Sequence, residues 1–416
     1  MTSEDGLAGW SGFWEAGQTV SWGEMMQSSA KLRGRLHQER PAAVVAPVPA
    51  GLALVTMLLA VRDTDIAVLI AGSNIPDSTV ARVGADIIAE WVGSEGSFTV
   101  RRLSDPPGRK QGTGRSGLWL LSAGTTGEPK PFFWPWDNLA PSVEWGRGNE
   151  HWAIGYAPHS FACVSATCEA LGRASSVEFV RSTDLVSPAP DAVRLTVAAA
   201  TPSFWRLAAV AGDARSFRRV ETVTVGGEMV DQSFLDLMRE IVAPDRIKQI
   251  FGATEVGTPI HVDDGLPGLP ENLRGRRLPG GGAFDVQEDL LVISPRPGAP
   301  YTETGDLVRF ADGRVHVVGR VGIHVNVGGM KANPYRVAQL LQEHDSVLAA
   351  RAYGIRSALL GQVVAADVVA RGGSDPSWLV ADLKRYSGAR LDTHERPQRI
   401  RVVESLAVAE SGKVQM

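Results

Sequence analysis

Residues 42–61, "AAVVAPVPAGLALVTMLLAV", are almost wholly apolar and as long as a membrane-spanning helix. Pro47, Pro49 and Gly51 interrupt this run, and proline removes a backbone donor that an uninterrupted helix needs. The residues before the prolines are rich in valine, which is typical of a buried strand, and those after them suit a buried helix. We therefore predict a strand, a turn and a helix here instead of a membrane span.

Short runs of β-branched or apolar residues recur along the chain. They lie at residues 65–70, 118–123, 194–200 and 221–227. Several lead into stretches with helical character, such as "DQSFLDLMREIV" at 231–242. Strands that alternate with helices are typical of α/β proteins with mostly parallel sheets.

The pattern changes after about residue 280. "AFDVQEDLLVISP" and "GDLVRFADGRVHVVGR", with its Asp312–Gly313 turn, predict antiparallel hairpins. A compact tail with its own helix ("NPYRVAQLLQEH") and strands ("VVAADVVA", "RIRVVES") follows. Because 416 residues exceed the size of one hydrophobic core, we predict an α/β protein with two domains. A large N-terminal domain (1–320) has layered sheets, helices and a β-rich subdomain, and a small α+β domain (321–416) follows.

Composition excludes several classes of function. The net charge is −4 and no basic run is present, so nothing favours nucleic acid or a membrane surface as partner. Cys163 and Cys168 are too few for a disulfide framework, and we interpret them as reduced core thiols of a cytoplasmic protein. The first residues, "MTSEDGLAGW", lack the basic and apolar regions of a signal peptide.

The loop "SAGTTGEPK" at 122–130 is the first candidate site. It is not a Walker loop, because Lys130 does not directly follow the second glycine. A nearby G-x-G-x-x-G run at 112–117 precedes a strand instead of following one, so it does not fit a dinucleotide fingerprint.

Several groups in this loop suit a polyphosphate. Gly124 and Gly127 let backbone N–H groups approach an anion, and Lys130 adds a positive charge. Hydroxyl donors come from Ser122, Thr125 and Thr126. Taken alone, the loop could also be a polar turn.

Further motifs follow in a fixed order. They are "YAPHSFA" (156–162), "VGGEMV" (225–230), "IFGATEVG" (250–257), "YTETGDL" (301–307), "GRVGIHVNVGGMKANPYRV" (319–337) and "ESGKVQM" (410–416). Together with "SAGTTGEPK" they resemble the AMP-forming adenylating superfamily, which includes acyl-CoA synthetases, adenylation domains of nonribosomal peptide synthetases, and luciferases. The resemblance covers residues 118–416, although the chain is shorter than most members. It implies that the small C-terminal domain is a mobile lid.

The resemblance also implies a set of site residues. ATP or AMP would contact Ser122, Gly124, Thr125, Thr126, Gly127, Lys130, Gly226, Gly227, Glu228, Phe251, Gly252, Ala253, Thr254, Asp306 and Arg320. Catalytic roles fall to Lys413, Thr126, Glu255 and His159, and Mg²⁺ would bind Thr126 and Glu255. A hinge is expected at Val321 and Gly322, and a thiol channel at Gly328, Gly329 and Lys331.

These residue types suit the chemistry. Joining a carboxylate to ATP brings two anions together, so catalysis needs charge neutralisation and alignment. Glu255 can hold Mg²⁺, and Asp306 can accept hydrogen bonds from both ribose hydroxyls. Each of these residues could instead have a purely structural role. Asp306 could be a turn residue, Glu255 a surface carboxylate and His159 a histidine of the hydrophobic core.

The acid pocket would be lined by His159, Phe161, Ser165, Gly226, Ile250 and Gly252. In the family, the residue at the Ile250 position closes or opens the acyl tunnel, and a bulky residue favours a small aryl or short-chain acid. The expected reaction is adenylation of such an acid with ATP and Mg²⁺, followed by transfer to CoA. This chemistry suits secondary metabolism.

Other readings stay open. The acceptor could instead be a carrier-protein phosphopantetheine or an amine, and the chain could be a non-catalytic nucleotide-binding relative. We expect a monomer or homodimer.

Overall fold

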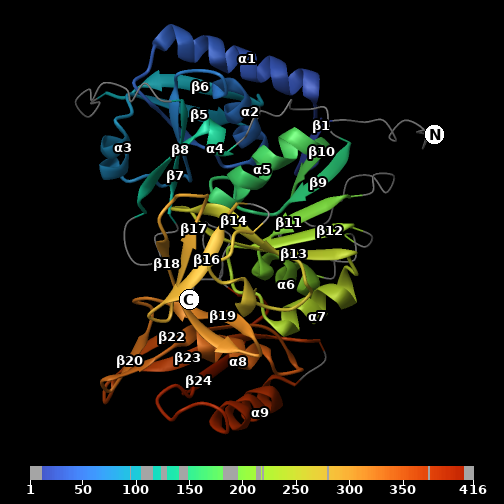
Figure 1. The fold of residues 1–416 in the computed structure, drawn as a ribbon, viewed down its shortest axis with the longest axis vertical. Helices are drawn as coiled ribbons and strands as arrows, with labels where there is room; N and C mark the ends of the chain where they lie inside the picture. Colours follow the sequence, from blue (N-terminus) through green and yellow to red (C-terminus); the bar gives the residue numbers. More distant parts are fainter. Residues whose placement is uncertain are drawn as a thin grey trace, which may run out of the picture. The chain divides into compact units, whose positions relative to one another are not determined.

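The computed structural model describes residues 12–93, 95–104, 116–122, 129–139, 149–180, 195–211, 217, 220–278, 281–372 and 375–406. The chain divides into two compact units, and Figure 1 colours it from its N-terminus to its C-terminus. The first unit consists of Met1–Ala200, Arg219–Thr224 and Ala253–Gly257. The second consists of Thr201–Arg218, Val225–Gly252 and Thr258–Met416.

One sheet of the first unit has the order β6-β5-β3-β4-β7-β8. Its strands are β3 (Val44–Pro47), β4 (Ala67–Ala71), β5 (Ile87–Val92), β6 (Ser97–Arg102), β7 (Gly117–Leu121) and β8 (Pro131–Pro135). The four inner strands pair in parallel, and the edge strands β6 and β8 are antiparallel. The helices of this part are α1 (Trp22–Glu39), α2 (Gly51–Val61) and α3 (Asp77–Val83).

A second sheet of this unit has the order β12-β11-β9-β10-β1-β2. Its strands are β1 (Gly12–Glu15), β2 (Gln18–Ser21), β9 (Glu150–Ile154), β10 (Ala174–Phe179), β11 (Val197–Ala200) and β12 (Thr222–Gly226). The pairs β1/β10, β10/β9 and β11/β9 are parallel. Two helices belong to this part, α4 (Trp136–Leu139) and α5 (Phe161–Arg173).

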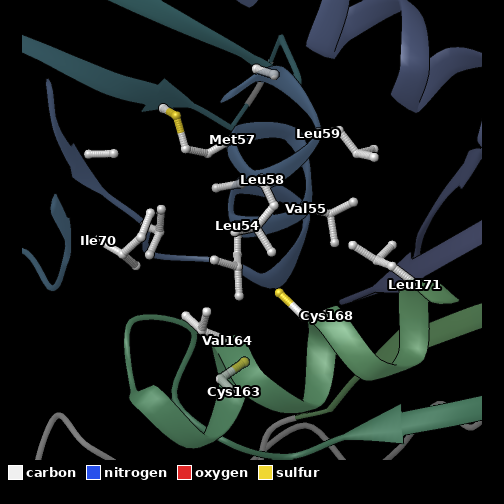
Figure 2. Packing of buried hydrophobic residues seen from close by; sticks show 14 of the residues in the cluster. Leu54, Val55, Met57, Leu58, Leu59, Ile70, Cys163, Val164, Cys168 and Leu171 are labelled. Carbon is white, nitrogen blue, oxygen red and sulfur yellow. The ribbon is translucent and has the colours of Figure 1, made fainter. Parts of the chain in front are cut away.

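Helix α2 forms the centre of the first unit, and all eleven of its residues are buried. Figure 2 shows Leu54 and Val55 of this helix on the side toward Cys168 and Leu171 of α5, and all four residues belong to one hydrophobic core. The carboxylate of Glu15 accepts hydrogen bonds from the first two backbone N–H groups of the helix, at 2.9 and 3.0 Å. These bonds satisfy donors that a buried helix start would otherwise leave unpaired. A Cβ on Gly51 would lie 2.0 Å from the Phe179 ring, so only glycine fits.

The second unit begins with two helices and two strands. They are α6 (Pro202–Ala211), α7 (Gln232–Ile241), β13 (Arg246–Ala253) and β14 (Gly257–Val262). Strand β13 lies between β14 and the end of β12. Asp231 caps α7 by accepting a hydrogen bond from the backbone N–H of Phe234 at 2.7 Å.

An antiparallel sheet of the order β15-β19-β18-β17-β16 follows. Its elements are β15 (Leu269–Pro270), the 3₁₀ helix Glu271–Leu273, β16 (Ala283–Gln287), β17 (Leu290–Ser294), β18 (Thr302–Ala311) and β19 (Arg314–Arg320). Strands β18 and β19 are joined by Asp312 and Gly313, both with positive φ, 51° and 70°. Two such residues are what a tight hairpin with a right-handed twist requires.

The last part of the second unit has a hydrophobic core of its own, formed by residues between Val325 and Ile400. Its strands are β20 (Val325–Val327), β21 (Met330–Ala332), β22 (Val347–Ser357), β23 (Gly361–Ala370) and β24 (Arg399–Val402). Its helices are α8 (Pro334–Gln342) and α9 (Pro376–Gly388), which contribute Val337, Leu341, Leu379 and Leu383 to this core.

The structure confirms the α/β class and the elements expected from the pattern. Residues 42–61 divide into β3 and α2. Within the described ranges, none of the helices combines the length and apolarity that a membrane crossing needs. Both cysteines are free and buried, and burial raises the pKa of each thiol to about 12. The domain boundary near Arg320 stays a prediction.

Candidate active site

The predicted phosphate loop joins two paired strands. Leu121, at the end of β7, pairs with Pro131, at the start of β8. The backbone N–H of Ser122 donates to the Lys130 carbonyl at 3.0 Å, and the Lys130 N–H donates to the Ser122 hydroxyl, also at 3.0 Å. The two ends of the loop are thus fixed at a hairpin base, and the Lys130 side chain is exposed. Gly124, Thr125, Thr126 and Gly127 lie outside the described residues.

Trp134 connects this hairpin to the Thr254–Glu255 turn of the same unit. Its indole N–H donates to the Thr254 carbonyl at 3.0 Å, and its ring lies 5.2 Å from the Phe161 ring. Gly257, with φ of 80°, follows the turn, and a Cβ there would lie 3.1 Å from Trp134. The indole therefore brings together residues of three separate motifs.

The turn itself presents a carboxylate to solvent. The Val256 N–H donates to the Ala253 carbonyl at 3.0 Å, which closes a turn with Glu255 at its tip. Glu255 is exposed, and Thr254 is half-buried. An exposed carboxylate can bind a hydrated cation.

Three predicted acid-pocket residues surround the start of α5. Ser160 caps this helix by accepting from the Cys163 N–H at 3.1 Å. His159 precedes the cap in a turn, and Phe161 and Ser165 follow it. Residues four apart lie on one helix face, so Phe161 and Ser165 share a surface, and all three side chains are half-buried.

In the second unit, the predicted adenine-side turn is fixed to α6. Glu228 accepts a hydrogen bond from the Ser203 N–H at 2.8 Å. Gly227 has φ of 81°, and Gly226 is buried against Ile250, where an added Cβ would lie 3.3 Å from the Ile250 Cβ. This close packing ties the end of β12 to β13, on which half-buried Phe251 and exposed Gly252 follow Ile250.

Asp306 and Arg320 form an ion pair across β18 and β19. The Arg320 Nε lies 3.0 Å from the Asp306 carboxylate, and both side chains are partly exposed, at 29% and 23%. Arg320 also donates to the Thr304 carbonyl at 2.9 Å. The pair thus lies where β19 ends, and the partly exposed Asp306 carboxylate can accept further hydrogen bonds, as hydroxyl recognition needs.

Replacing Asp306 with asparagine should weaken ATP binding about 10- to 100-fold, because a hydrogen bond to a charged group contributes about 1.5–3 kcal/mol. Titration calorimetry with ATP measures the effect. Asp312→Asn, in the hairpin turn of the same strand pair, is the matched control and should bind ATP normally. Equal affinity in both variants would remove Asp306 from the nucleotide site.

The predicted hinge is a tight turn. The Ile323 N–H donates to the Arg320 carbonyl at 3.2 Å, and Gly322 has φ of 80° at the third position. This geometry requires glycine or a close substitute. Val321 and Gly322 are exposed. The predicted thiol-channel residues Gly328, Gly329 and Lys331 are also exposed, on the β20–β21 hairpin.

Sequence reasoning overlooked Trp134 and Tyr335. The aromatic run "PFFWPW" after the loop was a signal for Trp134, but its contact with Thr254 spans 120 residues. Tyr335 on α8 gave no signal. Burial raises the pKa of its phenol, and the charges of Arg320 and Asp306 also act on it. The phenol of Tyr335 is therefore within the range of electrostatic interaction with the Asp306–Arg320 pair. Lys413 is outside the described residues.

The AMP-binding enzyme family matches residues 7–289, and its C-terminal domain matches residues 336–413. The chain belongs to this family of adenylating enzymes, as the motifs predicted. Among curated relatives, it is 27% identical to triostin synthetase I of Streptomyces triostinicus over 71% of the chain, and it spans 63% of that protein's length. It is 27% identical to 4-coumarate–CoA ligase of Halorhodospira halophila, covering 72% of this chain and 75% of the relative.

Solved structures support the fold. The chain superposes on a benzoate CoA ligase from Burkholderia xenovorans LB400 with a TM-score of 0.71 and 15% identity, covering 98% of this chain and 96% of the other. This confirms the predicted architecture of a large N-terminal and a smaller C-terminal domain.

Proposed function

We propose that this protein activates a small aryl or short-chain carboxylic acid with ATP and then transfers the acyl group to the thiol of CoA. The observation that carries the proposal is the family match over both predicted domains. The Ser122–Lys130 hairpin base and the Asp306–Arg320 pair support it.

In the first step, a carboxylate oxygen of the acid attacks the α-phosphorus of ATP, and the bond to the β-phosphate oxygen breaks to release pyrophosphate. The loop at 122–130 would bind the leaving phosphates through N–H and hydroxyl donors. Phe251 would stack on adenine beside the Gly226–Gly227 turn, and Asp306 would bind the ribose. Lys413 would neutralise charge on the oxygen that joins acid and phosphate.

Mg²⁺ would be held by Glu255 with Thr126. Across the residues that the structure covers, no cluster of three or more His, Cys, Asp or Glu side chains forms a metal cage. Mg²⁺ that bridges ATP phosphates needs only one or two protein carboxylates, so exposed Glu255 fits this role. When bound, the ion would offset phosphate charge.

In the second step, the thiolate attacks the carbonyl carbon of the acyl-adenylate, and AMP leaves with the electron pair of the broken bond. The thiol would reach the site past Gly328, Gly329 and Lys331 once the lid turns about Val321 and Gly322. His159, at the start of α5, would lie beside the acyl and thiol paths.

The size of the acid is proposed from Ile250. Ile250→Gly removes four side-chain carbons, and each additional methylene of a longer acid should then gain about 0.8 kcal/mol, which is several-fold in kcat/KM. The native small acid should lose about 1–3 kcal/mol of binding. A homologous series of acids, assayed by pyrophosphate release, measures the shift.

Ile247→Ala is the matched control for this change. Ile247 is buried on the same strand, three positions before Ile250, so the two side chains point to opposite faces of the sheet. This variant should lose stability but keep the parent's preference for chain length. If Ile250→Gly also keeps that preference, Ile250 does not line the acid pocket.

Product analysis tests the acceptor. After incubation with ATP, a small aryl acid and CoA, mass spectrometry should detect AMP and the acyl-CoA thioester. Adenylate formation without thioester would exclude CoA, and a carrier-protein phosphopantetheine or an amine would then be the acceptor. ATP binding with no acid-dependent product across an acid panel would indicate a non-catalytic relative.

A further inference from the structure

Asn333 bridges the two sides of the predicted hinge. Its side-chain N–H donates to the Val318 carbonyl on β19 at 2.9 Å. Its side-chain oxygen accepts from the N–H groups of Tyr335 and Arg336, at 3.0 and 3.3 Å, and so caps α8. One amide therefore joins β19, before the hinge, to α8, after it.

Gly319 makes this bridge possible. A Cβ at Gly319 would lie 2.9 Å from the Asn333 amide nitrogen and 3.3 Å from its oxygen. Real Cβ atoms do not approach this closely, and both ends of the amide are already bonded, so the amide could not move aside without losing a partner. The φ of Gly319 would allow other residues. It is the close approach of the Asn333 amide that requires glycine at this position.

Arg206 forms a second bridge across the hinge. On α6, its guanidinium donates to both carboxylate oxygens of Asp231, at 3.0 and 2.9 Å. Its other terminal nitrogen donates to the Leu348 carbonyl on β22 at 3.1 Å. The Arg206 and Asp231 side chains are only 7% and 11% exposed. If the Leu348 carbonyl moved away, a buried donor of Arg206 would lose this acceptor.

A third contact across the hinge is weak. Arg371 lies 3.5 Å from Glu240, with side chains that are 43% and 69% exposed. Exposed pairs of this kind contribute little, which makes Arg371 a suitable control.

In the arrangement that these bridges hold, the β20–β21 hairpin faces solvent. Met330 is 52% exposed, and Lys331 and Gly329 are exposed. The predicted thiol-channel residues are therefore exposed to solvent in this arrangement and do not enclose a channel. The bridged arrangement is the one expected before thiol transfer.

We propose that Asn333 and Arg206 are positioning residues that hold the C-terminal domain in the orientation for adenylate formation. This inference rests on the proposed two-step function, and neither residue contacts the reacting atoms. Breaking either bridge should favour the other orientation, since the lost hydrogen bond changes the equilibrium about threefold to tenfold.

Three variants test the bridges. Asn333→Asp keeps the helix cap, because aspartate caps as well as asparagine, but it removes the donor to Val318. Gly319→Ala places a methyl group against the same amide. Arg206→Lys keeps the charge beside Asp231 and replaces the forked donors with one ammonium. Arg371→Gln is the control.

The first readout needs no substrate. Hydrogen exchange followed by mass spectrometry on the ligand-free protein should show faster exchange at residues 318–323 in all three variants. The capped amides of Tyr335 and Arg336 should stay protected in Asn333→Asp, and Arg371→Gln should match the parent. Unchanged hydrogen exchange at residues 318–323 in Asn333→Asp and Gly319→Ala would contradict the proposal that Asn333 holds β19 and α8 together.

The second readout compares half-reactions. Pyrophosphate exchange should fall about threefold to tenfold in each variant, while thioester formation from supplied acyl-adenylate is unchanged or faster. Equal losses in both half-reactions would show a merely structural role and overturn the proposal. If the parent protein forms no adenylate, the proposed function is wrong. Hydrogen exchange on the ligand-free protein still tests the bridge in that case.

Discussion

Replacing Lys413 with alanine is expected to slow adenylate formation by about 10²–10³-fold, because an interaction that stabilises developing charge contributes about 3–4 kcal/mol. ATP affinity should change little, since this lysine acts on charge that forms during the reaction. The family match to the C-terminal domain extends to this residue. Single-turnover measurement of acyl-adenylate, with ATP binding measured separately, gives both quantities.

The same variant should still convert supplied acyl-adenylate to thioester, because the lid would then have turned Lys413 away. Lys384→Ala is the matched control, since Lys384 is exposed on α9 of the same domain. It should be fully active in both steps. A Lys413→Ala variant that loses both half-reactions equally would contradict a role confined to the first.

Gly322→Pro should abolish overall turnover while leaving one half-reaction intact. Gly322 has φ of 80°, and proline is restricted to φ near −65°, so the hinge turn cannot keep its observed geometry. Because that geometry belongs to the orientation proposed for adenylate formation, we expect the variant to lose pyrophosphate exchange and to retain thioester formation from supplied acyl-adenylate. Separate assays of the two half-reactions measure this.

Gly322→Ala provides the graded comparison. Alanine can adopt positive φ at a cost of about 1–2 kcal/mol, so this variant should slow turnover without separating the half-reactions. Unchanged turnover in Gly322→Pro would contradict the assignment of the hinge to this turn.

Local features of the sequence predicted local structure well. Pro47 ends β3, Pro49 lies between β3 and α2, and Asp312–Gly313 joins β18 to β19. Each rests on backbone geometry that a few adjacent residues determine, such as the missing donor of proline or positive φ. Gly322 in the predicted hinge is a further example of such local geometry, because its φ is also positive.

Contacts between distant segments could not be predicted. Trp134 donates to Thr254, Glu228 accepts from Ser203, and Arg206 reaches Leu348 across 142 residues. Each depends on strand order and helix packing, which periodicity in one sequence does not encode. The motifs therefore indicated which residues belong to the candidate site, and the fold was needed to find the residues that position them.

The sharpest test of the proposed adenylation is acid-dependent exchange of labelled pyrophosphate into ATP. We expect exchange when a benzoate-sized or short-chain acid is present, none without acid, and AMP as the nucleotide product after a thiol is added. Release of ADP and phosphate would contradict it. So would the absence of exchange with every acid of a broad panel, measured on folded protein that binds ATP.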